Sequence, residues 1–297
     1  MTSGGCKGGL QPPVIRFDPL VEPVPLVCDS PHSGTSYPAD FGHAVPMTAL
    51  RQGEDTHVHE LWSAAPSVGA TLLHATFPRA YIDPNRHLGD LDPALIDGVW
   101  PDPLEPGEKT RLGKGLVWSR LDADTPIYNR RLSPTEIRRR INDYYRPYHR
   151  ALDEAVDECH ERFGSMWHLN LHSMPGDVFR RLGIHSHEPL ADFVLGDRDG
   201  TTCEPAFVDL IEQYLRACGY SVARNFPYKG VELIAQIGRP AQRRYSLQVE
   251  IRRPVYMDEA TREPNDGFAP LRDALSGLLR ELSAYVQHQA GTLARRL

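Results

Sequence analysis

The chain has 297 residues, of which 40% are hydrophobic and 24% charged, so it is long enough to bury a full hydrophobic core. Its net charge of −6, with basic residues spread along the chain, argues against a nucleic-acid-binding surface. No apolar run is long enough to cross a bilayer, and no signal-peptide pattern opens the chain. The five cysteines show no CxxC spacing and indicate reduced thiols. We therefore expect a cytoplasmic protein with no membrane or nucleic-acid partner.

Strand and helix patterns alternate along the chain. Short apolar runs predict buried strands, and apolar residues at helical spacing predict helices. The predicted strands cover residues 24–28, 71–77, 166–171, 192–195, 220–226 and 245–251, and the predicted helices cover residues 47–68, 133–160, 204–218 and 270–297. This alternation predicts a single-domain α/β fold with a central mixed, mostly parallel sheet flanked by helices.

Two segments lack regular periodicity. The chain begins with a Gly-rich stretch, so we expect residues 1–20 to be a flexible N-terminal lead-in and residues 21–297 to form one catalytic domain. Residues 88–130 are rich in Pro, Gly and Asp. A segment of that length inside a domain indicates a functional loop or lid rather than a linker.

A histidine stands at the end of two predicted strands that lie far apart in the chain. His32 follows the first strand in the sequence SPHSG, and His172 follows strand 166–171 in the sequence HSMPG. Ligands of open α/β sheets bind beyond the carboxyl ends of the strands. Either histidine alone is explained by a hydrogen bond to the backbone. Two of them at the same sheet edge, with carboxylates nearby, predict a metal site.

A third metal ligand is expected from the helix that follows the first strand. Zinc hydrolases use about three N or O ligands and leave one position open for water. Glu54 and Asp55 lie early in that helix, where acids also occur simply because they complement the helix dipole. His57 and His59 are two residues apart and so point to different helix faces, which argues against a shared role as ligands.

Glu250 interrupts an otherwise apolar strand. It shares one strand face with Gln248, while Leu247, Val249 and Ile251 share the other. A buried, unpaired glutamate is costly, so its face must meet water, a cation or a hydrogen-bond network. A salt bridge to Arg252 or Arg253 is one explanation. A general base beside a metal-bound water is the functional one.

Polar side chains that suit carboxylate recognition follow the strand 71–77. Arg79, Asn85 and Arg86 lie in the loop after it. Guanidinium groups at the ligand-binding end of a sheet favour bidentate binding of a carboxylate. Together with a metal and a base glutamate, they predict hydrolysis of an amide near a free carboxylate.

Six segments in sequence order resemble the N-formylglutamate amidohydrolase family: SPHSG at 30–34, ED at 54–55, FPRAYIDPNR at 77–86, HSMPG at 172–176, DFVLGDRDGTTC at 192–203 and LQVEIRRPVYMDE at 247–259. The resemblance extends from about residue 24 to residue 285. It implies a zinc-carboxypeptidase-like fold and hydrolysis of the N-formyl or N-acyl amide of an acidic amino acid, such as N-formyl-L-glutamate.

The resemblance also implies which residues form the site. The implied ligands of one Zn²⁺ ion are His32, Asp55 and His172, with Asp55 rather than Glu54 at the family position. Glu250 takes the place of the general base. The implied substrate-binding residues are Arg79, Asn85, Arg86 and Arg253.

Two segments depart from the family pattern. Residues 229–235 read KGVELIA where a KGGxxTR-like stretch is common, and residues 250–253 read EIRR where an ExNR-like one is common. Both fall where substrate contacts are expected, so the catalytic centre is better supported than the substrate. Deacylation of another N-acyl amino acid or small peptide therefore stays open, as does a non-catalytic protein that binds an amino-acid-like ligand. The joint presence of the three ligands and Glu250 favours an enzyme, and the oligomeric state stays open.

Overall fold

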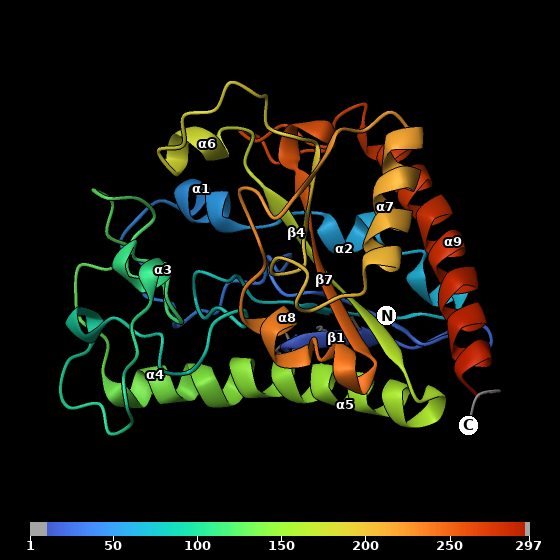
Figure 1. Cartoon of the computed structure of the whole chain (residues 1–297). Coiled ribbons are helices and arrows are strands. Elements are labelled where there is room, and N and C mark those ends of the chain that lie inside the picture. Colours follow the sequence, from blue (N-terminus) through green and yellow to red (C-terminus); the bar gives the residue numbers. More distant parts are fainter. Residues whose placement is uncertain (1–10, 295–297) are drawn as a thin grey trace, which may run out of the picture.

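A seven-stranded mixed sheet forms the centre of the molecule (Figure 1), in a computed structural model that describes residues 11–294. The four central strands, in the order β3, β2, β4 and β7, run parallel, and β1 and β5 pair antiparallel to the ends of this group. The single-domain α/β fold with a mixed, mostly parallel sheet is thus confirmed. In sheet order the strands are β1 (Val14–Phe17), β3 (Thr71–Ala75), β2 (Leu26–Ser30), β4 (Met166–Met174), β7 (Arg244–Arg252), β5 (Phe193–Gly196) and β6 (Val222–Arg224).

Helices cover both faces of this sheet. The helices are α1 (Met47–Leu50), α2 (Val58–Leu61), α3 (Glu108–Arg111), α4 (Pro134–Arg140), α5 (Arg146–Phe163), α6 (Val178–Arg181), α7 (Pro205–Ala217), α8 (Glu232–Ile237) and α9 (Phe268–Ala294). Figure 1 shows α4 and α5 along one side of the sheet, with α7 and α9 together on another. Because side chains alternate along a strand, Val27 of β2 packs in the core with Leu152 of α5, whereas Cys28 packs in the core with Leu275 of α9.

The helix predicted over residues 133–160 consists of α4 and α5 joined by a π-helical turn, Ile141–Tyr145. Ser133 caps its start by accepting a hydrogen bond from the backbone N of Glu136 at 3.2 Å. At the π-turn, the hydroxyl of Tyr145 donates to the carbonyl of Arg86 at 2.8 Å. Such turns often mark functional sites, and this one anchors the loop that follows β3.

The structure differs from the sequence-based prediction at two places near the N-terminus. Within the expected lead-in, residues 14–17 form strand β1, because its backbone pairs with β3; residues 1–10 of that lead-in, with Cys6, lie outside the described residues. The predicted helix 47–68 is broken into short helical turns. His57 interrupts it with a left-handed backbone (φ 68°), and the backbone N of Asp55 instead donates to the carbonyl of His32 at 2.9 Å.

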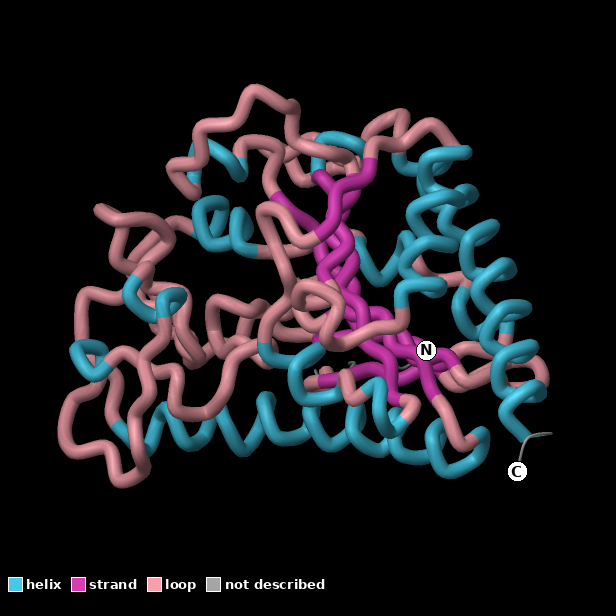
Figure 2. Tube along the Cα trace, viewed as in Figure 1, coloured by secondary structure: helices cyan, strands magenta, loops and turns pink. Residues whose placement is uncertain are grey.

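The remaining long segment is largely irregular, as its composition predicted. Within residues 88–130 the regular elements are short, a 3-10 turn at Pro93–Leu95 and α3, and Figure 2 shows this side of the molecule as mainly loop. Cys28, Cys159, Cys203 and Cys218 are free thiols. No helix within residues 11–294 is both long enough and apolar enough to cross a membrane.

Candidate active site

The carboxyl ends of the parallel strands bring the predicted site residues to one edge of the sheet. His32 lies two residues beyond β2, and His172 and Glu250 lie near the ends of β4 and β7. The register of these two strands places His172 directly opposite Glu250. Asp55 reaches the same edge because its backbone is bonded to that of His32. Residues from four distant parts of the chain therefore meet in one place.

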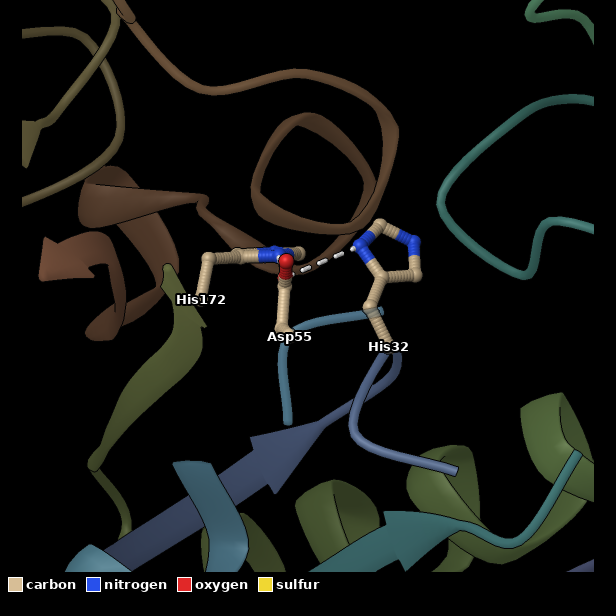
Figure 3. A group of neighbouring side chains, drawn as sticks. All are labelled: His32, Asp55 and His172. Atoms are coloured by element: carbon tan, nitrogen blue, oxygen red, sulfur yellow. Dashed lines mark hydrogen bonds and ion pairs between the residues drawn. The ribbon is translucent and has the colours of Figure 1, made fainter. Parts of the chain in front are cut away.

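His32, Asp55 and His172 form a compact, buried trio. One potential ligand atom from each lies within 4.8 Å of the others, and none of the three residues is more than 2% exposed. Oδ2 of Asp55 lies 3.1 Å from Nδ1 of His172 and 3.5 Å from Nδ1 of His32. Figure 3 shows the three side chains pointing toward one another. Glu54, the alternative to Asp55, is absent from the trio and accepts hydrogen bonds from Tyr37 and Thr56 instead.

The outer nitrogen of each imidazole is held by a protein acceptor. Nε2 of His32 donates to Asp83 at 2.7 Å, and Nε2 of His172 donates to Oδ1 of Asn170 at 2.7 Å. Burial lowers the pKa of His172 to about 4, so this imidazole is neutral at pH 7. A neutral imidazole that carries its proton on Nε2 has a lone pair on Nδ1. The inner atoms of the trio are therefore electron-rich.

This arrangement fits a divalent cation. Nδ1 of His32 is buried and has no hydrogen-bond partner, and the lone pairs of His172 and Asp55 face each other. A positive ion between them removes the repulsion. Ligands about 2.0–2.2 Å from a tetrahedral zinc ion lie about 3.3–3.6 Å apart, close to the observed 3.1 and 3.5 Å. The donor set of two imidazoles and one carboxylate suits zinc.

A further network of buried hydrogen bonds supports Asn170, the residue that accepts from His172. The amide of Asn170 donates to Asp29 at 2.7 Å, and His168 donates to the same carboxylate oxygen at 2.8 Å. Tyr148 donates to the other oxygen of Asp29. Partners of this kind fix the orientation of a metal-binding histidine. Sequence reasoning missed Asp29, Asn170 and Asp83, although polar residues at 168, 170 and 172 mark one face of β4.

Glu250 lies beside the trio without an ion pair among the described residues. It is 7% exposed, and the hydrogen bond it accepts comes from the amide of Gln248 at 2.9 Å. Burial and the charge of Asp55 raise its pKa to about 8. A positive charge nearby would favour the ionised form of this carboxyl. Glu250 is thus a buried carboxyl that a nearby cation would convert to its charged, basic form.

Neither arginine next to Glu250 in sequence forms the salt bridge considered above. Arg252 pairs with Asp192 at 2.5 Å. Arg253 donates to Asp55 at 3.0 Å and to Ser173 at 3.1 Å. Arg253 therefore orients the carboxylate of Asp55. Its donors are directed to these buried groups and not to an open surface.

Asn85 and Arg86 also bond within the protein. Oδ1 of Asn85 accepts from the backbone N of Leu233 at 3.0 Å, and its Nδ2 lies 3.2 Å from Nε2 of His172. Arg86 donates to the carbonyls of Lys114 and Asn85 at 3.0 and 2.7 Å. Leu233 belongs to the divergent KGVELIA segment, which forms part of the support for Asn85.

Arg79 differs from these arginines in having unused donors. Its nearest carboxylate oxygens, on Asp83 and Asp55, are 3.6 and 3.7 Å away, and its buried Nε has no hydrogen-bond partner. The side chain is 18% exposed. A guanidinium placed this way beside the trio has donors left for an anionic ligand.

His57 and His59, which follow Asp55 in the sequence, lie outside the trio. His57 bonds to Glu60 and to the carbonyl of Arg262, and the ring of His59 stacks on His74 with centroids 4.1 Å apart. The expectation that this pair does not share a metal stays a prediction, and the possible metal-binding group among the described residues is His32, Asp55 and His172.

Known proteins resemble this chain over most of its length. The N-formylglutamate deformylase of Pseudomonas aeruginosa is 30% identical over 271 residues, which cover 87% of this chain and 91% of that protein. The deformylase of Pseudomonas putida is 29% identical over 277 residues, covering 88% and 93%.

Solved structures give the same result. The crystal structure of N-formylglutamate amidohydrolase from Ralstonia eutropha JMP134 superposes with a TM-score of 0.92 at 65% identity, covering 93% of this chain and 99% of that one. A protein from Agrobacterium tumefaciens shares the fold, with a TM-score of 0.64 at 16% identity and 94% of each chain covered. Residues 24–257 match the family model for N-formylglutamate amidohydrolase. With its strand-end trio and this match over most of its length, the chain belongs to the N-formylglutamate amidohydrolase family.

Proposed function

We propose that this protein is a zinc-dependent hydrolase that removes the N-formyl group of N-formyl-L-glutamate. The observation that carries the proposal is the trio of His32, Asp55 and His172, with its inner lone pairs converging beside Glu250. The relatives named N-formylglutamate deformylase support the choice of substrate.

In this proposal the trio holds one zinc ion, which supplies Lewis acidity that acidifies water and polarises a carbonyl oxygen. Glu250 takes a proton from the attacking water as the new C–O bond forms. It then delivers that proton to the amide nitrogen as the C–N bond breaks, giving formate and the free amino acid. Asp83 and Asn170 keep the two imidazoles in the tautomer that binds metal.

Arg79 is the residue we assign to the α-carboxylate of the substrate. The sequence pattern gave this role to Arg86, assisted by Asn85 and Arg79. Arg86 is 6% exposed and already donates to two carbonyls, whereas the Nε of Arg79 has no hydrogen-bond partner. We therefore assign the α-carboxylate to Arg79. A carboxylate held there would lie next to the metal ligands, because Arg79 is 3.7 Å from Asp55.

The proposed function is tested by following formate release from N-formyl-L-glutamate. We expect turnover by the zinc-loaded protein, loss of turnover after treatment with a chelator, and recovery when zinc is added back. N-acetyl-L-glutamate and N-formyl-L-leucine in the same assay measure selectivity for the acyl group and the side chain. Full activity in the metal-free protein, or no hydrolysis of any N-formyl amino acid, would contradict the proposal.

Replacing Arg79 by lysine should selectively weaken binding of the α-carboxylate. A guanidinium binds a carboxylate in a geometry that an ammonium does not reproduce. Hydrogen bonds to charged groups contribute about 1.5–3 kcal/mol, so kcat/KM should fall roughly 10- to 150-fold for N-formyl-L-glutamate. The loss should be smaller for its α-methyl ester. Arg86→Lys is the control, and an acid-selective loss there instead would move the role back to Arg86.

A further inference from the structure

Residues 88–130 bring a second group of cations next to the site. Trp118 anchors the group to the trio, because its Nε1 donates at 3.4 Å to Asp83, which also holds His32. The guanidinium of Arg79 lies 5.1 Å from the centre of the Trp118 ring, and the ammonium of Lys114 lies 5.5 Å from it. Both cations therefore lie against one indole within reach of the metal ligands.

Lys109 of α3 extends this group toward Glu250. Its ammonium lies 5.8 Å from the centre of the Tyr228 ring. Burial and the charge of Glu250 raise the pKa of Tyr228, and the charge of Glu250 also acts on Lys109. Figure 1 shows α3 on the loop-rich side of the molecule, away from α9. Lys109 thus lies against an aromatic ring, as Lys114 does.

The two lysines are cations without a counter-ion. Burial, followed by the charge of Arg86, lowers the pKa of Lys109. Burial, followed by the charge of Arg79, lowers the pKa of Lys114 to about 8. Neither ammonium forms an ion pair within the part of the chain that the structure describes, whereas exposed Lys229 pairs with Asp199 at 2.7 Å. Partly buried like charges repel one another, and a bound anion relieves that repulsion.

We propose that Lys109 and Lys114 form a subsite for a second carboxylate, which binds the side-chain carboxylate of an acidic N-acyl amino acid. The inference rests on the proposed function and adds to it the residues that select an acidic side chain. Arg79 holds the α-carboxylate, Lys114 lies against the same indole as Arg79, and the backbone N of Lys114 donates to the carbonyl of Lys109 at 2.8 Å. The long segment 88–130 thereby contributes to substrate selection.

The subsite is tested first by kinetics. Selectivity is the ratio of kcat/KM for N-formyl-L-glutamate to that for N-formyl-L-glutamine, which has the same shape and no side-chain charge. Lys109→Met and Lys114→Met keep the apolar stem over the aromatic ring and remove the charge. Each should lower the ratio by about 10-fold or more. Arg162→Met is the control. Arg162 of α5 is also a cation over an aromatic ring, with its guanidinium 5.2 Å from the centre of the Phe163 ring, but it pairs with Glu22, so the ratio should be unchanged.

A binding measurement separates this inference from the proposed reaction. Calorimetry on the zinc-loaded protein compares glutarate with its monoamide, glutaramate, neither of which carries an N-formyl group for the proposed reaction to remove. Preference for glutarate in the wild type, lost in both lysine variants and kept in Arg162→Met, supports the subsite even where no formate is released. Equal binding of both ligands by the wild type, or an undiminished preference in the two variants, overturns it.

Discussion

Replacing Glu250 by glutamine should lower kcat by roughly 10²–10⁴, the usual contribution of a positioned acid–base group. Glutamine keeps the size of the side chain and its ability to accept the hydrogen bond from Gln248 at 2.9 Å. It removes the basic oxygen that takes the proton from water. Because Glu250 is absent from the trio, zinc content should stay at one ion per chain. Formate release and elemental analysis measure the two effects separately.

The matched control is Glu204→Gln. Glu204 also accepts hydrogen bonds from neutral donors, the indole of Trp167 at 2.8 Å and the hydroxyl of Tyr285 at 2.9 Å, and it lies away from the trio. Glutamine can accept both bonds, so this variant should keep its kcat. Unchanged turnover in Glu250→Gln would show that Glu250 serves only to pair with Gln248.

Replacing either histidine of the trio by alanine should abolish stoichiometric zinc binding and, with it, activity. Removing a partner that only supports a ligand costs roughly 10- to 100-fold in metal affinity, and loss of a ligand itself should cost more. Each substitution leaves two of the three potential ligands, Asp55 and the other histidine. Zinc per chain after dialysis measures the effect for His32→Ala and His172→Ala, and circular dichroism checks that the sheet is retained.

His160→Ala is the control for metal binding. His160 lies near the C-terminal end of α5 and bonds to the carbonyl of Gln242 at 2.9 Å, just before the first residue of β7, whereas Glu250 lies near the last. It should bind zinc like the wild type. Full zinc occupancy in both trio variants would refute the assignment of the ligands.

The periodicity of the chain was sufficient to predict six of the seven strands, all but β1, and the sheet edge at which the candidate site lies. Buried parallel strands need near-continuous apolar runs, and these runs lead to His32, two residues beyond β2, and to His172, near the end of β4. Since parallel strands share one carboxyl edge, local pattern plus that rule brings both histidines together. The isolated glutamate of β7 was recognisable for the same reason, because a charge in an apolar strand needs a specific partner.

The ligand choice between Glu54 and Asp55 depended on tertiary contacts. The two acids are neighbours with similar chemistry, and the predicted helix treated them alike. The structure breaks that helix, ties the backbone of Asp55 to His32, and turns Glu54 toward Tyr37. No local pattern encodes a hydrogen bond between residues 23 positions apart.

The roles of the arginines were likewise decided by the fold. In the sequence, Arg79, Arg86 and Arg253 are equivalent cations near strand ends. Whether a guanidinium is free for substrate depends on which acceptors the packed chain places around it. Arg253 donates to Asp55 and Arg86 donates to the carbonyl of Lys114, while the Nε of Arg79 makes no hydrogen bond and lies 3.6 Å from Oδ2 of Asp83. Residue types and strand pattern thus determined which reactive side chains could meet at the carboxyl edge of the sheet. The long-range packing of loops against β2 and β4 determined which side chains remain available to perform it, because hydrogen-bond saturation is a property of three-dimensional neighbours.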